Sequence, residues 1–456
     1  MNDCIHLRRG GLLLSATLLA GHALAAVAPD EAARLGAQLT PIGAEHAASA
    51  DGAIPAWDGG LAPAAGKAQA NGTPADPFAA DQPLFTITAA NLEQYRDRLS
   101  PGQVAMLKRY PDSYRLPVYP SRRTVAVSDE IKRAAAHNAG ATRLINDGNG
   151  LENFQGAVAF PIPQNGLEVI WNHVTRYRGG SFLATTDSAA PQPGGDYAIT
   201  TTEQRFTLRD WISDYKPGQG DNLLFYYSHK VTAPARQAGE VLLVHETLDQ
   251  VREPRMSWVY NAGQRRVRRA PDVSYDATGV TTAGLRTADS RDMFNGAPDR
   301  YDWKLVGKRE LYIPYNSYRL LATDLPYTEI IRPGHIAPDP TRYELHRVWE
   351  VVATLKPGAR HIYSKRHYFI DEDTWAIAEA DHYDSRGELW RVGENHGYFH
   401  YEAQVPLTAM EVFYDLQGGR YIASGMTNQQ RRAYDFGYRA SASDYSPGAL
   451  RSAGVR

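Results

Sequence analysis

The chain has 456 residues, enough for two or three average domains or for one large sheet-rich unit with a sizeable core. Its 49 lysine and arginine residues nearly balance 51 aspartate and glutamate residues, and the net charge of -2 argues against binding to nucleic acid or another polyanion. Tyrosine (27 residues) and tryptophan (8 residues) are abundant, and such amphipathic aromatic side chains suit sheets and apolar cavities with a polar rim.

The first 25 residues have the pattern of a secretory signal peptide. Arg8 and Arg9 form its positive region, residues 11–20 its apolar region, and residues 23–25 (Ala-Leu-Ala) its cleavage signal. The apolar run is much shorter than the ~20 residues that span a bilayer, so a membrane anchor is disfavoured. The single cysteine, Cys4, lies in this segment, so the mature chain has no thiol for a disulfide, a nucleophile or a metal site. We therefore expect a periplasmic protein without a transmembrane segment.

Residues 26–85 are expected to form an extended N-terminal arm. From residue 43 to residue 83 the composition is dominated by alanine, glycine and proline, which is typical of a segment that lies extended on a main body. Thr88, Ser100 and Ser128 are the predicted N-caps of the helices that follow. Helices are thus concentrated in the N-terminal third of the chain.

Beyond Gly156, runs of β-branched and aromatic residues alternate with turn residues, which predicts a long antiparallel sheet. The expected strands are 167–178, 181–186, 197–210, 222–233, 240–247, 255–261, 265–269, 303–312 and 409–415, with a meander over 343–392 between the last two. So many strands in one sheet must curl or close, and the helices are available to cover one face. The predicted fold class is α+β, mostly antiparallel β. We expect one large curved sheet over residues 86–456, with N-terminal helices covering its concave face.

The meander separates an apolar face from a polar one by strict alternation. On its first strand Leu345, Trp349 and Val351 share one side, and Glu344 and His346 share the other. The polar side is interpreted as the solvated outside of the sheet. The apolar side is the one expected to touch a ligand.

Polar clusters in the meander are candidate sites. Asp371, Glu372 and Asp373 could bind calcium, but they lack the alternating oxygen ligands and glycine of a calcium loop, which favours a solvated hairpin tip. Glu379 and Asp381 point to the same side of one strand, which leaves an acid/base pair open. The histidines are expected to be structural or exposed, because the segment around the closest pair contains Gly397 and aromatic residues and does not have the features of a helix. They are His361, His367, His382, His396 and His400.

Sequence motifs for nucleophilic, phosphate-binding, dinucleotide and haem chemistry are absent, and we predict no catalytic residue, no metal and no cofactor. The run Arg265–Arg269 is the most unusual local feature. Alternation places Arg266 and Arg268 on one face and Arg265 and Arg269 on the other. Such arginines either pair with cross-strand carboxylates or contact lipid head groups or another protein.

Five stretches, taken together, are characteristic. They are LTPIGAEHAASADGAIPAWDGG (39–60), GLEVIWNH (166–173), WVYNAGQRRVRRAP (258–271), FNGAPDRYDWKLVGKRELYIPYNSY (294–318) and ELHRVWEVVATLKPGARHIYSKRHYFIDEDTWAI (344–377). They resemble the DUF1329 family over nearly the whole mature chain. The resemblance implies an exported Gram-negative protein of the outer-membrane lipoprotein-sorting type with a LolA/LolB-like half-barrel, whose concave apolar side is covered by helices. It also implies an RND-family exporter and a DUF1302-type outer-membrane protein as partners, and it implies no catalytic residue.

These observations predict periplasmic binding and shuttling of a lipid or other hydrophobic ligand between the two membranes, without turnover. Such a carrier needs apolar volume, because each buried methylene is worth about 0.8 kcal/mol. The candidate lining residues are Leu345, Trp349, Val351, Phe369, Trp375 and Ile377. Arg266 and Arg268 are the candidates for partner or head-group contacts. Two alternatives are a non-catalytic scaffold of an envelope complex and a lipid or glycan hydrolase that uses Glu379 and Asp381.

Overall fold

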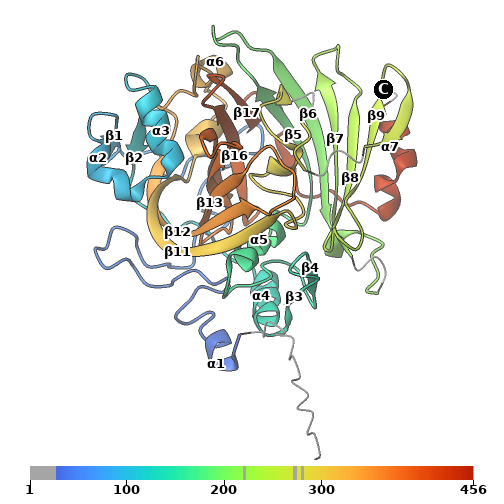
Figure 1. The fold of residues 1–456 in the computed structure, drawn as a ribbon, viewed down its shortest axis with the longest axis horizontal. Coiled ribbons are helices and arrows are strands. Elements are labelled where there is room, and N and C mark those ends of the chain that lie inside the picture. Colours follow the sequence, from blue (N-terminus) through green and yellow to red (C-terminus); the bar gives the residue numbers. More distant parts are fainter. Residues whose placement is uncertain (1–26, 219–221, 271–274, 279–281, 455–456) are drawn as a thin grey trace, which may run out of the picture.

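The computed structural model describes residues 27–218, 222–270, 275–278 and 282–454 (Figure 1). The predicted signal peptide, residues 1–25, lies outside this range. Within these residues, we find no helix that is long and apolar enough to cross a membrane.

One sheet of 16 strands dominates the described part of the chain. Its long strands are β5 (Ser181–Ala189), β6 (Ile199–Leu208), β7 (Leu223–Ala233), β8 (Val241–Thr247), β9 (Met256–Asn261), β10 (Arg266–Arg269), β11 (Tyr301–Pro314), β12 (Tyr343–Leu355), β13 (Lys365–Asp371), β14 (Ile377–Tyr383), β15 (Leu389–His400), β16 (Val405–Asp415) and β17 (Arg420–Met426). Short strands β1 (Phe85–Ile87), β2 (Leu116–Val118) and β18 (Tyr434–Asp435) complete it, while β3 (Arg143–Ile145) and β4 (Gly150–Glu152) form a separate hairpin.

The order of the strands is β1-β2-β12-β13-β14-β15-β16-β17-β5-β6-β7-β8-β9-β10, with β11 paired to β12 and β18 to β5. The pairings are antiparallel apart from a parallel bridge between β2 and β12. The path does not return to its start, so the sheet is open. The predicted fold class, α+β with a large curved antiparallel sheet, is confirmed.

The helices are α1 (Pro29–Ala32), α2 (Leu92–Tyr95), α3 (Pro101–Arg109), α4 (Asp129–Ala141), α5 (Gly166–Thr175), α6 (Tyr327–Ile330) and α7 (Pro447–Gly454). The predicted N-caps at Ser100 and Ser128 are confirmed, because both hydroxyls accept a hydrogen bond from the backbone of the first turn. The prediction at Thr88 was wrong, since α2 begins only after Asn91.

Helix α5 corrects the largest error in the expected elements, because residues 167–178 were predicted to be a strand. The Asn165 side chain accepts from the Glu168 N–H at 3.0 Å and starts the helix. Nine of its ten residues are buried. The polar residues Glu168, Asn172 and Thr175 are at helical spacing, but the run of β-branched and aromatic residues around them resembles a buried strand.

The concave side of the sheet is the face that bears Phe206, Tyr227, Tyr368 and Phe413, and its apolar residues form one cluster with those of α5. In Figure 1, α5 lies between the arc of β11 and β12 and the strands β5 to β9. Among the helices predicted to cover this face, α4 contributes to the cluster. The hairpin of α2 and α3 belongs to a second cluster, which includes side chains from the opposite face of β15 and β16. Helices do cover the concave face, as predicted. They are α5 and α4, however, and not the hairpin of α2 and α3.

The N-terminal arm runs over the body of the protein without long elements of its own. Trp57 donates its indole N–H to the Val125 carbonyl at 2.8 Å, and the Asn71 amide donates to the Thr427 carbonyl at 3.1 Å. Ile54 is buried against the second cluster. The predicted boundary between arm and domain at residue 85 stays a prediction.

Candidate functional site

The six predicted lining residues occupy the interior in three different places. Val351, Trp375 and Ile377 belong to the concave-face cluster, and Trp349 packs against it and stacks on Trp375 with ring centroids 6.1 Å apart. Leu345 belongs instead to the second cluster.

Phe369 lies in a third, small cluster together with Val348 and residues of β11. It pairs with Glu350 on β12, so it points to the side of the sheet opposite to Trp349 and Val351. The predicted common face is therefore wrong for Phe369, whereas Leu345 shares a face of β12 with Trp349 and Val351 but packs in the second cluster.

The cavities found among the described residues are not lined by these six side chains. Two cavities beside β13 and β14 hold only ≈ 30 Å³ each. A depression of ≈ 680 Å³ is lined largely by polar residues of the arm and of the loop between β11 and β12, and one of ≈ 870 Å³ by residues 112–115 and the same loop. On the concave face, side chains of α5 pack into the cluster of the sheet.

Apolar surface is more accessible at the β8–β10 end of the concave face. Leu242 and Val259 are paired across β8 and β9, and both are half-buried. Val259 is paired in turn with Arg268, and Asn261 with Arg266, so these side chains point to the same side of the sheet. Both arginines are exposed on the last strand of the sheet.

The arginine run does not form the cross-strand ladder with carboxylates that was one of its two interpretations. The partners of Arg266 and Arg268 are Asn261 and Val259, and no carboxylate of the described residues forms an ion pair with either arginine. Arg269 lies on the opposite face, over the Trp258 ring at 5.4 Å. The guanidinium groups of Arg266 and Arg268 are therefore exposed beside half-buried apolar side chains, where they can bind an anionic group.

The turn between β13 and β14 is buried, which corrects its interpretation as a solvated hairpin tip. Asp371, Glu372 and Asp373 are each at most 3% exposed. Arg123 forms a two-bond pair with Asp373, with Nη2 and Nε at 2.6 and 2.9 Å from its oxygens. Lys308 Nζ lies 2.7 Å from Glu372 Oε2. These cations satisfy charges that burial would otherwise make costly.

The polar side of β12 is also buried, where solvent was predicted. Glu344 and His346 have exposures of 0% and 1%. They pair with Ile313 and Leu311 of β11, and β11 curves far enough to contact β14 and β15. Strands β11 to β15 thus enclose Glu344 and His346, which the alternation of the sequence had placed on the solvent side.

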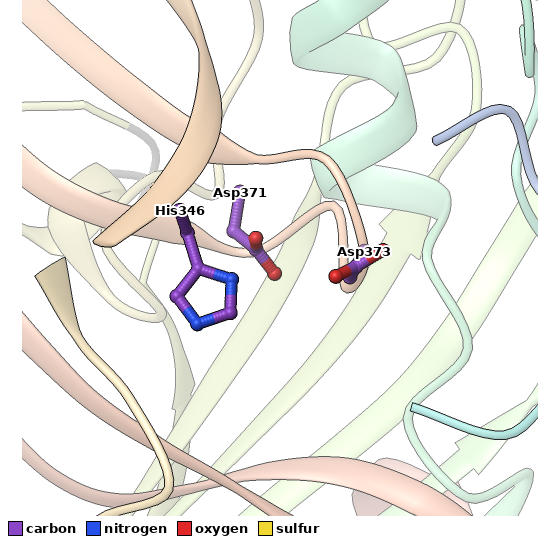
Figure 2. A group of neighbouring side chains, drawn as sticks. All are labelled: His346, Asp371 and Asp373. Carbon is purple, nitrogen blue, oxygen red and sulfur yellow. The ribbon is translucent and has the colours of Figure 1, made fainter. Parts of the chain in front are cut away.

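His346, Asp371 and Asp373 come together at this point, with one potential ligand atom from each within 4.8 Å of the others (Figure 2). Burial lowers the pKa of His346, but the hydrogen bond and charge of Glu344 outweigh it and raise the pKa above its ordinary value. Burial, followed by the charge of Asp373, raises the pKa of Asp371 to about 7. Sequence reasoning missed this cluster, because His346 is brought to the turn by the pairing of β12 with β13.

Glu379 and Asp381 share one face of β14, as predicted, but α3 covers them. Gln103 donates to Glu379 Oε1 and the Gly102 N–H donates to Asp381 Oδ2, both at 3.0 Å. Burial raises the pKa of Glu379 well above its usual range, helped by the charge of Glu394, and it raises the pKa of Asp381 to about 7. Both carboxyls are fully buried, so a substrate would reach them only after displacement of α3.

The five meander histidines are structural. His382, His396 and His400 are buried, and His361 and His367 are half-buried beside Asp289 and Glu350, at 3.1 and 2.7 Å. His396 and His400 lie on β15, which confirms that they are not on a helix.

Comparison with known proteins establishes the family. Residues 86–451 match the family described as "Protein of unknown function (DUF1329)", so the chain belongs to this family, as its sequence motifs predicted. It is 60% identical to the uncharacterized protein PA3922 of Pseudomonas aeruginosa over 444 residues, which cover 97% of this chain and 98% of that protein.

Similar solved structures are more distant. A domain provisionally assigned as an outer membrane lipoprotein-sorting protein from Vibrio parahaemolyticus has a TM-score of 0.43 at 11% identity, covering 63% of this chain and 98% of its own. A DUF1329 family protein from Desulfovibrio piger has 0.39 at 15% identity (59% and 91%). A LolA superfamily protein from Nitrosomonas europaea has 0.35 at 11% identity (60% and 92%). Likenesses of this size place no ligand and no residue.

Proposed function

We propose that this protein binds a hydrophobic ligand with an anionic head group in the periplasm, without chemical turnover. The observation that carries the proposal is the common face of half-buried Leu242 and Val259 with exposed Arg266 and Arg268. Apolar contact supplies affinity at about 0.8 kcal/mol per buried methylene, and guanidinium groups bind carboxylate or phosphate with two parallel hydrogen bonds. A fatty acid or an acidic lipid has both features.

The remainder of the concave face is the second part of the proposed site. Trp349, Val351, Trp375 and Ile377 lie on or against the cluster that α5 fills, so a long acyl chain would reach them by displacing part of that helix. Leu345 and Phe369 stay candidates of lower rank, because they lie in other clusters. We further propose transfer of the ligand between the membranes with an RND-type exporter and a DUF1302-type outer-membrane protein, which rests on the sequence resemblance.

The first experiment is organic extraction and mass spectrometry of the mature protein purified from its own periplasm, followed by titration with a fluorescent fatty acid. We expect a co-purified lipid and saturable binding of the probe. A protein that is always empty and binds no probe would contradict the proposal.

The head-group contact is tested with the double variant Arg266→Gln/Arg268→Gln. We expect the probe to bind at least about 100-fold more weakly, since each of the two lost charge-assisted hydrogen bonds is worth about 1.5–3 kcal/mol. The matched control is Arg431→Gln/Arg432→Gln, two adjacent exposed arginines outside this face, which should leave affinity unchanged. Equal affinities for wild type and the first variant would remove the arginines from the site.

A scaffold role is the second candidate, because the same arginines lie on the terminal strand of the sheet, where unpaired backbone groups can also pair with another chain. A pull-down from envelope extracts distinguishes the two functions. Loss of partner capture by Arg266→Gln/Arg268→Gln, with probe binding intact, would favour the scaffold.

A further inference from the structure

The group formed by His346, Asp371 and Asp373 is chemically different from the other buried polar groups. It combines one imidazole with two carboxylates inside a protein interior, and one potential ligand atom of each lies within 4.8 Å of the others (Figure 2). A cluster of acidic residues does not by itself define a metal site. The hydrogen bonds and ion pairs of each member show whether it is free to bind an ion.

Asp371 lacks the cation that each neighbouring carboxylate has. Asp373 is paired with Arg123, Glu372 with Lys308 and Glu344 with Arg342, whereas no lysine, arginine or histidine nitrogen among the described residues lies within 4.0 Å of an Asp371 oxygen. Asp371 Oδ2 accepts from the Thr374 N–H and hydroxyl at 2.9 and 2.6 Å. Its Oδ1 is buried without a hydrogen-bond partner in the same set of residues. A buried carboxylate oxygen with no partner calls for a proton or a cation.

Tyr315 provides an independent sign of a missing ligand. Its ring stacks on His346 with centroids 3.8 Å apart, and its hydroxyl is buried with no hydrogen-bond partner in the described chain. A cavity of ≈ 30 Å³ is lined by Tyr315, Asp371 and Thr374, which places the ring beside this carboxylate and leaves room for one water molecule or one ion.

His346 is oriented for coordination. Its Nε2 lies 3.1 Å from Glu344 Oε2, and Arg342 and Asn316 hold the other oxygen of Glu344. Figure 2 shows the other ring nitrogen turned towards Asp371. A carboxylate that accepts from one imidazole nitrogen leaves the second nitrogen free for a metal, as in carboxylate–histidine–zinc arrangements.

We propose that His346, Asp371 and Asp373 bind one divalent transition-metal ion of the zinc type, with the Tyr315 hydroxyl or a water molecule as a further ligand. Imidazole with carboxylates suits Zn²⁺, whereas Ca²⁺ and Mg²⁺ prefer oxygen ligands alone. Two atoms bound to one Zn²⁺ at about 2.0–2.2 Å lie at most ~4.4 Å apart, so binding would draw the group together slightly from its present spacing. The ion would join β12 to the turn on which Arg123 docks. The proposal does not depend on the ligand-binding proposal.

The test uses the mature chain, residues 26–456, stripped with a chelator and titrated with Zn²⁺ by calorimetry, with the bound metal counted by mass spectrometry. We expect one ion per chain, and no comparable binding of Ca²⁺ or Mg²⁺. Asp371→Asn keeps the Thr374 hydrogen bonds and removes the ligand charge. It should lower the Zn²⁺ affinity at least about 100-fold, since even partners one layer outside a metal site cost 10–100-fold.

Asp381→Asn is the matched control, because Asp381 is an equally buried carboxyl on the adjoining strand and lies outside the group. It should bind Zn²⁺ as the wild type does. Absorption of the Co²⁺-loaded protein is a second readout, and His346→Gln should change its visible bands. A stripped protein that binds no Zn²⁺ at 100 μM, or equal affinities for the wild type and a folded Asp371→Asn variant, would overturn the proposal.

Discussion

Two buried groups of carboxyls on the β13–β14 hairpin are neutralised in opposite ways. At the turn, Asp373 and Glu372 meet Arg123 and Lys308. On β14, the carboxyls of Glu379 and Asp381 accept hydrogen bonds from a side-chain amide and a backbone N–H of α3. Cations at the turn offset the cost of burying carboxylates, although burial still raises the pKa of Glu372, whereas on β14 burial raises the pKa of both carboxyls without a bonded cation among the described residues.

The difference shows what each group contributes to the fold. The cations of the turn come from distant segments, so its ion pairs tie those segments to the sheet at the cost of taking charges out of water. The carboxyls of β14 accept hydrogen bonds from α3, which lies directly on β14. Mutation of a cation should therefore disturb the first group most, and a change of pH the second.

Arg123→Met should have the largest effect on stability. It leaves Asp373 buried without its cation, and breaking such a pair typically costs about 3–5 kcal/mol. Urea unfolding followed by circular dichroism gives the free energy of unfolding. The control is Arg122→Met, which removes a pair with Asp81 whose arginine side chain is 44% exposed and should cost at most about 1 kcal/mol. Equal losses in the two variants would show that the turn does not depend on its cation.

Asp381→Asn should change the pH dependence of stability. The pKa of this carboxyl is about 7 in the folded protein against an ordinary 3.8, so the folded state binds the extra proton. Its contribution is complete below about pH 4 and is lost as the pH rises towards 7. At about 1.36 kcal/mol per unit, the wild type should lose about 3 kcal/mol more than the variant between pH 5 and pH 8.

The matching control is Asp302→Asn, at an exposed position of β11, which should follow the wild-type profile. Denaturant midpoints at intervals of half a pH unit provide the measurement. Parallel profiles for Asp381→Asn and the wild type would mean that the Asp381 carboxyl is ionised in the folded protein. The proposed difference between the carboxyls of β14 and those of the turn would then be wrong.

Much of the fold was predictable because its signals are local. Alternation located β6 to β9 and the meander, and the caps at Ser100 and Ser128 located two helices. Helix α5 was missed because its β-branched and aromatic residues favour a strand by composition, and the helical spacing of Glu168, Asn172 and Thr175 was overlooked. The buried state of Glu344 and of the turn was missed because their partners, such as Arg123, lie more than 200 residues away in the sequence.

The candidate site divides in the same way. The exposure of Arg266 and Arg268 follows from a short charged run on a terminal strand. The face on which Phe369 lies cannot be predicted from a local run of residues, because it depends on how β13 pairs with its neighbours. Leu345 and Val351 share a strand but enter different clusters, since a strand of 13 residues is long enough to leave one cluster and reach another.

The smallest predicted effect concerns the two serine caps, which differ in what they support. Ser100 is fully buried and forms both bonds of a capping box with Gln103, each 3.0 Å long, beneath the helix that covers Glu379 and Asp381. Ser128 caps α4 with a single bond of 3.4 Å. Ser100→Ala should therefore cost about 1–2 kcal/mol, and Ser128→Ala about 0.5–1 kcal/mol, in the free energy of unfolding.

The double variant Ser100→Ala/Asp381→Asn makes this prediction specific to the carboxyls of β14. If α3 and the carboxyls of β14 are stabilised as one unit, the two losses should differ from their sum by about 0.5 kcal/mol or more. Ser128→Ala combined with Asp381→Asn should be additive, because α4 does not touch that group. Additivity in both pairs would mean that the capping box serves only its own helix, and that the pH response of Asp381 is independent of how α3 is held.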